Sequence, residues 1–408
     1  MPIRSALKFQ LYCSICAIFI LLSITLILPS PGRAHEPITT KVMFNKEVIR
    51  IFQRNCLGCH SPGKIKADIS LTTYDEARPW AKAIKEEVLE KRMMPYQAVK
   101  GFGIFHRDYI LPQREVDLIV SWVEGGAPRG EEKDYPKDEI EQLIKGDVWT
   151  MGPPDLVLEP EQEIKIDTGE QEVTRCFLLS TGLSANRWIN AVEFRPGNGA
   201  VVFSASLFIE RGKQKKDNES CSVERAGLGF LSNWVPGQAA VRLPNGFAQL
   251  LQSGSRIAVW ISYRNTGDAT TDRSRIGLYF SKEKISESIR QVTINAPEAM
   301  TQVNSDRQSI RVSYPVNVST TAVAIRPLLF PRVSSLEAAV NRPDGTIEVL
   351  IITKNYRFDW QPTYYFKKPV TFPKGSRIEV TAYLDKNDSS TSGKFAGPLC
   401  SLLLASPI

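Results

Sequence analysis

The chain has 408 residues, of which 42% are hydrophobic and 23% charged, so it is globular rather than disordered or collagen-like. This length is enough for two or three domains. The net charge of +7, from 51 basic and 44 acidic residues, is too small to indicate a nucleic-acid-binding protein.

The first 34 residues are predicted to be a signal peptide. Arg4 and Lys8 form a basic start, an uncharged apolar run extends from Leu11 to Leu28, and Gly32-Arg33-Ala34 offers small residues for cleavage. The apolar run just reaches membrane-spanning length, so an uncleaved N-terminal anchor is the alternative. Both interpretations predict an exported protein, periplasmic or associated with the outer face of a membrane.

The sequence Cys56-Leu57-Gly58-Cys59-His60 is the most specific motif in the chain. Two thiols one helical turn apart can form thioethers to the two vinyl groups of one haem, and the next histidine can bind the iron. The alternatives are a chance pair of buried cysteines or half of a zinc site, but His35 and His106 lack the spacing that zinc requires. The motif predicts one covalent haem c, held by Cys56 and Cys59, with His60 as an axial ligand.

Three helices are expected around this motif. Apolar residues from Phe44 to Phe52 recur at helical spacing and lead directly into the cysteines. A second helix is predicted from Pro79 to Glu90, and a third from Pro112 to a stop at Gly125. Together they predict a small all-α haem domain over residues 35–125.

The second axial ligand of the iron is expected in the sequence Arg92-Met93-Met94-Pro95. Met94 is the preferred ligand because Pro95 restricts it to an extended loop, whereas Met93 is expected to pack against the haem edge. His106 is the alternative, since histidine is the other common haem donor. A Met ligand opposite His60 suits electron transfer rather than oxygen activation.

These motifs resemble the monohaem cytochrome c domain of bacterial exported fusion proteins. The similar segments are Phe44-Asn45-Lys46-Glu47-Val48, Cys56-Leu57-Gly58-Cys59-His60, Tyr74-Asp75-Glu76-Ala77-Arg78-Pro79-Trp80, Met94-Pro95 and Trp122-Val123-Glu124-Gly125-Gly126-Ala127-Pro128. In that family the domain precedes a module similar to copper type II, ascorbate-dependent monooxygenases of the peptidylglycine and dopamine monooxygenase type. The resemblance covers nearly the whole chain after the signal peptide.

The remainder of the chain is predicted to be all β. Residues 126–155 are a charged linker, after which alternating apolar residues and Pro-Gly or Asp-Gly turns indicate sandwiches over 156–290 and 291–408. Gly254-Ser255-Arg256-Ile257 recurs as Gly375-Ser376-Arg377-Ile378, which weakly supports a duplication. The expected fold class is therefore multidomain, a small all-α cytochrome c domain followed by all-β tandem jelly-roll sandwiches.

The resemblance implies one copper in each sandwich, but the family's copper ligands do not carry over. Phe203-Ser204 and Ser262 replace histidines of the first sandwich, Leu328-Leu329-Phe330 replaces a His-x-His of the second, and a short tail, 399–408, replaces the segment that bears a Met ligand. No histidine follows His106, and type II copper depends on clustered imidazoles, so copper is not expected.

The remaining cysteines allow one disulfide in an exported protein. Cys176 and Cys221 could bridge neighbouring strands or stay as buried free thiols, with Cys400 left over.

The sequence favours a single-electron carrier over an enzyme. The β half has no histidine to activate a nucleophile and no phosphate-binding glycine loop. It is expected to dock the haem to a redox partner protein in the periplasm or at the outer face of the membrane. The alternatives are a cytochrome-fused oxidoreductase that completes its active site with another subunit, and a haem-based sensor with an open sixth iron position.

Overall fold

The computed structural model describes residues 39–92, 98–107, 111–145, 149–167, 172–210, 228–264, 267–296, 309–328, 333–354, 360–384 and 397–408. The predicted signal peptide lies outside these residues. Within the described ranges, no helix is long and apolar enough to cross a membrane.

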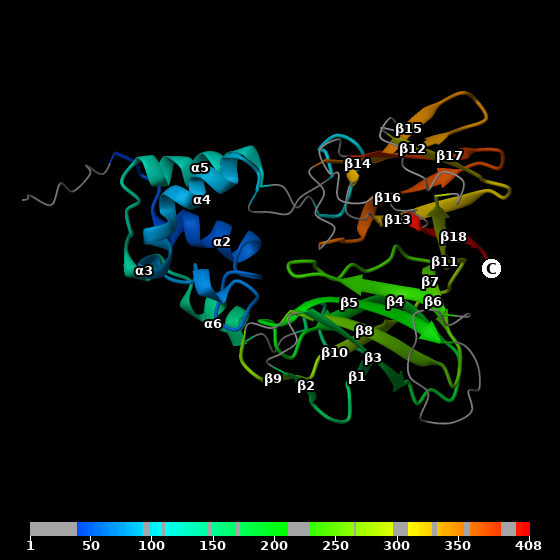
Figure 1. The fold of residues 1–408 in the computed structure, drawn as a ribbon, viewed down its shortest axis with the longest axis horizontal. Helices are drawn as coiled ribbons and strands as arrows, with labels where there is room; N and C mark the ends of the chain where they lie inside the picture. The colour runs from blue at the N-terminus through cyan, green and yellow to red at the C-terminus, as the bar shows by residue number, and fades with distance from the viewer. Residues whose placement is uncertain are drawn as a thin grey trace, which may run out of the picture.

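Short helices occupy the N-terminal part of the chain and gather on one side of the molecule (Figure 1). They include helices before Cys56, within residues 79–90 and after Pro112, as the periodicity predicted. Their apolar faces meet in one cluster that contains Phe44, Phe52, Leu57 and Trp122, all fully buried. In chain order the elements are η1 (Phe44–Val48), α2 (Ile49–Asn55), η2 (Ala67–Ile69), α3 (Tyr74–Ala77), η3 (Arg78–Trp80), α4 (Ala81–Leu89), α5 (Gln113–Glu124), η4 (Glu132–Asp134) and α6 (Lys137–Lys145).

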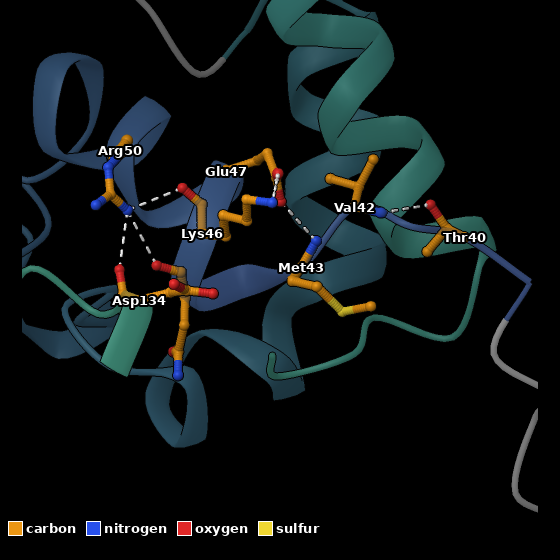
Figure 2. Close-up of polar contacts among 8 residues, drawn as sticks. Thr40, Val42, Met43, Lys46, Glu47, Arg50 and Asp134 are labelled. Atoms are coloured by element: carbon orange, nitrogen blue, oxygen red, sulfur yellow. Dashed lines mark hydrogen bonds and ion pairs between the residues drawn. The ribbon is translucent and has the colours of Figure 1, made fainter. Parts of the chain in front are cut away.

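Polar contacts fix the start of the helix that leads to the cysteines (Figure 2). The Glu47 carboxylate accepts a hydrogen bond of 2.9 Å from the Met43 N–H, one of the donors left unpaired at a helix start. The Arg50 guanidinium donates to the carbonyl oxygens of Lys46, at 2.9 Å, and Asp134, at 3.0 Å. Arg50 therefore ties η1 and α2 to the distant segment around η4.

Four β-sheets make up the rest of the described chain. One has eight strands in the order β1-β10-β4-β7-β11-β18-β13-β16, two have four strands, β3-β8-β5-β6 and β12-β17-β14-β15, and β2 pairs with β9. The strands are β1 (Leu156–Leu158), β2 (Ile164–Ile166), β3 (Glu172–Ser180), β4 (Arg187–Arg195), β5 (Val202–Glu210), β6 (Leu228–Trp234), β7 (Phe247–Leu251), β8 (Arg256–Arg264), β9 (Thr270–Asp272), β10 (Arg275–Phe280), β11 (Glu287–Asn295), β12 (Ser309–Pro315), β13 (Thr320–Pro327), β14 (Val333–Asn341), β15 (Ile347–Lys354), β16 (Tyr364–Phe372), β17 (Arg377–Leu384) and β18 (Pro398–Pro407).

The strands have β-sandwich character. Buried residues of β5 and β8 share one core with those of β4 and β10, so the first four-stranded sheet packs on one part of the long sheet. A second core joins β14 and β17 to β13 and β18. The repeated Gly-Ser-Arg-Ile sequences lead into β8 and β17, which begin at the Arg of each repeat and hold equivalent inner positions in the two four-stranded sheets.

The predicted fold class is wrong. The described chain is mostly β, its α-helices have only four to twelve residues, and they do not form a separate small all-α cytochrome c domain. Residues 98–107, inside the predicted helical domain, lie with the β half, where Ala98 bridges to Thr353 and Phe105 to Phe366.

The β part is also not a tandem of separate jelly rolls. The C-terminal tail, which was expected only to replace a lost segment, forms the strand β18. This strand pairs with β11 along Glu287–Asn295 and with β13 on its other side. One continuous eight-stranded sheet therefore runs through both halves. A helix, α6, also lies within the segment predicted as a linker.

Candidate functional site

The Cys56–His60 segment forms one further turn after α2. The Cys56 N–H donates to the Phe52 carbonyl at 2.7 Å, as in a continuing helix. The N–H groups of Cys59 and His60 both donate to the Cys56 carbonyl, at 3.0 and 2.9 Å. This turn, named the cysteine turn below, carries both thiols and the imidazole.

The imidazole of His60 is buried and its tautomer is fixed by the backbone. His60 is 9% exposed, and its Nδ1 lies 3.0 Å from the Ile69 carbonyl oxygen. Because a carbonyl oxygen only accepts hydrogen bonds, Nδ1 must carry the proton. Burial lowers the pKa of His60 despite the opposing effect of the Ile69 hydrogen bond, so the ring is neutral at pH 7. Nε2 then keeps its lone pair, as an iron ligand requires.

The two thiols of the cysteine turn are free and protonated. Cys56 and Cys59 are not joined by a disulfide. Burial raises the pKa of Cys56 to about 12 and that of Cys59 to about 11, although Lys64 and Lys66 oppose the shift at Cys59. Reactive dithiol sites depend on lowered thiol pKa values, so this pair lacks the electrostatics of a thiol–disulfide exchange centre.

The donor set of the cysteine turn fits a covalent haem better than a metal ion bound by thiolates. Attachment to vinyl groups needs two free thiols close together, and the axial position needs one neutral imidazole. Cys56 also belongs to the apolar cluster of the helices, with Leu57 and Leu71 fully buried beside it. An apolar surface of this kind suits the hydrophobic faces of a porphyrin.

The second axial ligand remains a prediction. Met94 and its neighbour Met93 lie outside the described residues. His106, the alternative ligand, is exposed. It lines a cavity of about 480 Å³ together with Asn55, the residue that precedes Cys56.

The positions at which the resemblance implied copper ligands of the first sandwich are cross-strand neighbours. Ser204 on β5 pairs with Ser262 on β8, and the Ser262 hydroxyl lies 3.0 Å from that of Thr174. The Phe203 ring is covered by the Arg264 guanidinium, 4.0 Å from the ring centroid. Leu328 follows β13, whereas residues 329–330 lie outside the described ranges. Among the described side chains, no group of three His, Cys, Asp or Glu is placed to hold a metal.

The remaining cysteines differ in state. Cys176 is part of a disulfide, and Cys400 is a buried free thiol on β18. Cys221, the predicted partner of Cys176, lies outside the described residues.

Sequence reasoning missed that the cysteine turn and its following loop rest on the β half. A Cβ at Gly58 would lie 3.7 Å from the Cα of Gly237, and a Cβ at Gly199 would lie 2.9 Å from the Gly63 oxygen. Gly237 belongs to the Pro236-Gly237 sequence and Gly199 follows Pro196-Gly197 by two residues; both Pro-Gly sequences indicated only turns. Gly199 has a second role, because a side chain there would come too close to the Gly63 backbone; at Gly237 a Cβ would meet nothing within 4 Å, and the positive φ of 81° is what favours glycine.

Comparisons with known proteins give only remote similarities to solved structures. No family model matches the chain, and no curated protein matches it. PNGF-II is a similar solved structure at 10% identity over 61% of this chain and 65% of its own, with a TM-score of 0.28. Allantoicase is similar at 9% identity over 56% of this chain and 76% of its own, with a TM-score of 0.19. The chain thus spans slightly less than two thirds of the PNGF-II chain. TM-scores of 0.28 and 0.19 are too low to support an argument about fold or function.

Proposed function

We propose that this chain is an exported c-type cytochrome that transfers single electrons through one haem c. In this proposal Cys56 and Cys59 attach the haem covalently, and His60 is an axial ligand of its iron. One observation carries the proposal: a neutral, buried imidazole with its Nδ1 proton committed to the Ile69 carbonyl stands on the same turn as two free thiols.

Each residue of the cysteine turn has a separate task in this proposal. Cys56 and Cys59 anchor the cofactor at two points, so that it cannot dissociate. The Ile69 carbonyl orients the His60 ring and makes Nε2 a stronger donor. The apolar cluster beneath the turn limits access of water. When bound, the haem supplies an iron that exchanges one electron between its ferric and ferrous states.

The other parts of the proposal rest on the sequence. Met94 is taken as the second axial ligand, and the N-terminal segment as the signal for export or as an anchor. The β half is taken to be free of copper, because the chain has three histidines and none follows His106. Its contact with the cysteine turn favours a role in presenting the haem to a redox partner protein.

The proposal uses only the motifs of the resemblance to exported haem c proteins with a degenerate copper monooxygenase-like module. The motifs suggest haem attachment, and the separate jelly-roll sandwiches that the resemblance implied are not part of the proposal.

The test of haem attachment is expression of the full chain in a bacterium that attaches haem c to exported proteins. After denaturing electrophoresis, the wild-type band should retain haem stain, because thioether bonds survive denaturation. Cys56→Ser combined with Cys59→Ser should lose the stain, whereas Cys400→Ser, the control at the buried thiol of β18, should keep it. A stained double variant would contradict the proposal.

The second axial ligand is tested by absorption spectra of wild type and of two variants, each with one of the adjacent methionines Met93 and Met94 replaced. Oxidised wild type should show the weak far-red band of a Met-to-iron bond and should bind carbon monoxide poorly when reduced. Met94→Ala should abolish the band and lower the reduction potential, while Met93→Ala should leave both unchanged. If wild type already binds carbon monoxide readily, a haem-based sensor replaces the electron carrier.

A further inference from the structure

A groove of about 1010 Å³ lies between the edge strands of two sheets. β15 is the last strand of its four-stranded sheet, and β16 is the last strand of the eight-stranded sheet. Residues of both strands line the groove, together with residues 101–104. It is named the edge groove below.

The segment of residues 98–107 reaches from β15 to β16 and forms one wall of the edge groove (Figure 1). At one end the Val99 N–H donates to the Ile352 carbonyl of β15 at 2.6 Å. At the other end the Lys367 N–H of β16 donates to the Ile104 carbonyl at 2.8 Å. Both ends are therefore held by backbone hydrogen bonds, which fix the wall against the two sheet edges.

Large apolar side chains are exposed around the edge groove. Ile104 is 73% exposed, Ile347 of β15 is 69% exposed and Phe102 is 39% exposed, and all three line the groove. Single exposed apolar residues are ordinary on a protein surface, whereas several around one groove indicate an interaction site. A partner that covered them would remove this apolar surface from water.

The charged side chains of the described lining leave a positive balance. They are Arg342, Glu348, Lys367 and Lys368. Arg342 and Glu348 form an ion pair with each other, whereas Lys367 and Lys368 form none within the described part of the chain. The edge groove therefore offers two ammonium groups to an acidic partner.

The exposure of both lysines follows from an irregularity in β16. Its pairing with β13 passes directly from Tyr365 to Val370, so residues 366–369 bulge out of the ladder. Successive side chains of a regular strand point to opposite faces, but here Lys367 and Lys368 are both exposed and both line the groove. Lysines at a sheet edge also hinder unwanted strand pairing, but that role does not explain the exposed apolar side chains beside them.

We propose that the edge groove docks an acidic segment of a partner protein. Carboxylates of this segment pair with Lys367 and Lys368, and its apolar side chains cover Ile104 and Ile347. Charge complementarity selects this occupant, because the segment neutralises the two lysines, whereas a second copy of this chain carries a net charge of +7. The interaction goes beyond the proposed electron transfer and needs no haem.

The test is isothermal titration calorimetry of the purified full chain with a peptide in which glutamate and leucine alternate. Two control peptides each lack one feature, because lysine replaces glutamate in one and serine replaces leucine in the other. Both controls should bind about tenfold or more weakly than the glutamate–leucine peptide, whose binding should also weaken as salt is raised. Equal binding of the lysine–leucine peptide, or no saturable heat with any peptide, would overturn the proposal.

Variants of exposed residues identify the surface that binds the peptide without disturbing the core. Lys368→Glu should weaken binding of the glutamate–leucine peptide about fivefold or more, whereas Lys165→Glu, on β2 and outside the groove, should not change it. Ile104→Ser should weaken binding to a similar degree, and Ile408→Ser, also exposed but outside the groove, should not. Equal losses in a variant and its control would contradict the site.

Sedimentation velocity of the full chain without peptide tests the other occupant. Wild type should sediment as a monomer. If it forms a dimer that Ile104→Ser dissociates, a second copy fills the edge groove and the proposal is overturned. Calorimetry and sedimentation read binding without any haem signal, so failure of haem attachment and failure of this site give separate results.

Discussion

Replacing Leu57 by alanine should lower the free energy of unfolding by about 3 to 4 kcal/mol. Leu57 lies between the two cysteines, is 0% exposed and packs in the apolar cluster with Phe52 and Trp122. The substitution removes three carbon atoms, which costs about 2.4 kcal/mol in transfer free energy at about 0.8 kcal/mol per carbon. The unfilled cavity adds the rest, because the surrounding helices can relax only in part.

The measurement is urea unfolding of the full chain, followed by circular dichroism at a helical wavelength. Gly58→Ala is the matched control, because its new Cβ would stand 3.7 Å from the Gly237 Cα, an ordinary contact. Its stability should stay within about 0.5 kcal/mol of wild type. A loss below about 1 kcal/mol for Leu57→Ala, or an equal loss in both variants, would refute the packing described for the cysteine turn.

Two further substitutions test neighbouring contacts. Gly199→Ala should cost about 1 to 3 kcal/mol of stability, because its Cβ would stand 2.9 Å from the Gly63 backbone oxygen. Calorimetric melting checks this, and an unchanged melting temperature would show that the two turns do not touch. Glu76→Gln should destabilise α3 at neutral pH, because hydrogen bonds from Thr72 and Thr73 outweigh burial and hold the pKa of Glu76 below its usual value. A carboxyl group whose pKa is lowered by folding stabilises the folded state fully above its unfolded-state pKa of about 4. The stability difference between wild type and Glu76→Gln should therefore begin to shrink near about pH 4 and be lost as the pH falls through the lowered pKa of Glu76. A difference that stays constant with pH would contradict this account.

Local features of the helical part could be predicted from the sequence. The apolar spacing from Phe44 to Phe52 and the stop at Gly125 reflect contacts within a few residues, and the helices appear where these signals place them. The same short-range signals do not reveal that residues 98–107 leave the helices for the β half.

The arrangement of the sheets could not be predicted in this way. Turn signals and alternation identify strands, but they do not state which strands pair. The pairing of β11 with β18 joins residues more than a hundred positions apart and converts two expected sandwiches into parts of one continuous sheet. Such pairing is decided by burial of both faces in three dimensions, which no local pattern encodes.

Only the side chains of the candidate site could be predicted from the sequence, not the groups that surround them. The motif identifies Cys56, Cys59 and His60, because their spacing carries the chemistry. The partner that fixes His60 is a backbone carbonyl, Ile69, and backbone groups have no sequence signature. The edge groove depends on the fold of the whole chain, and no motif marks it.

The central claim is tested most directly by mass spectrometry of one peptide. Trypsin should release residues 55–64, which contain both Cys56 and Cys59, because Arg54 and Lys64 bound the segment. From protein made with haem c attachment, this peptide should be heavier by one haem, and neither thiol should react with iodoacetamide. Recovery of the peptide without haem, with both cysteines alkylated, would contradict covalent haem attachment.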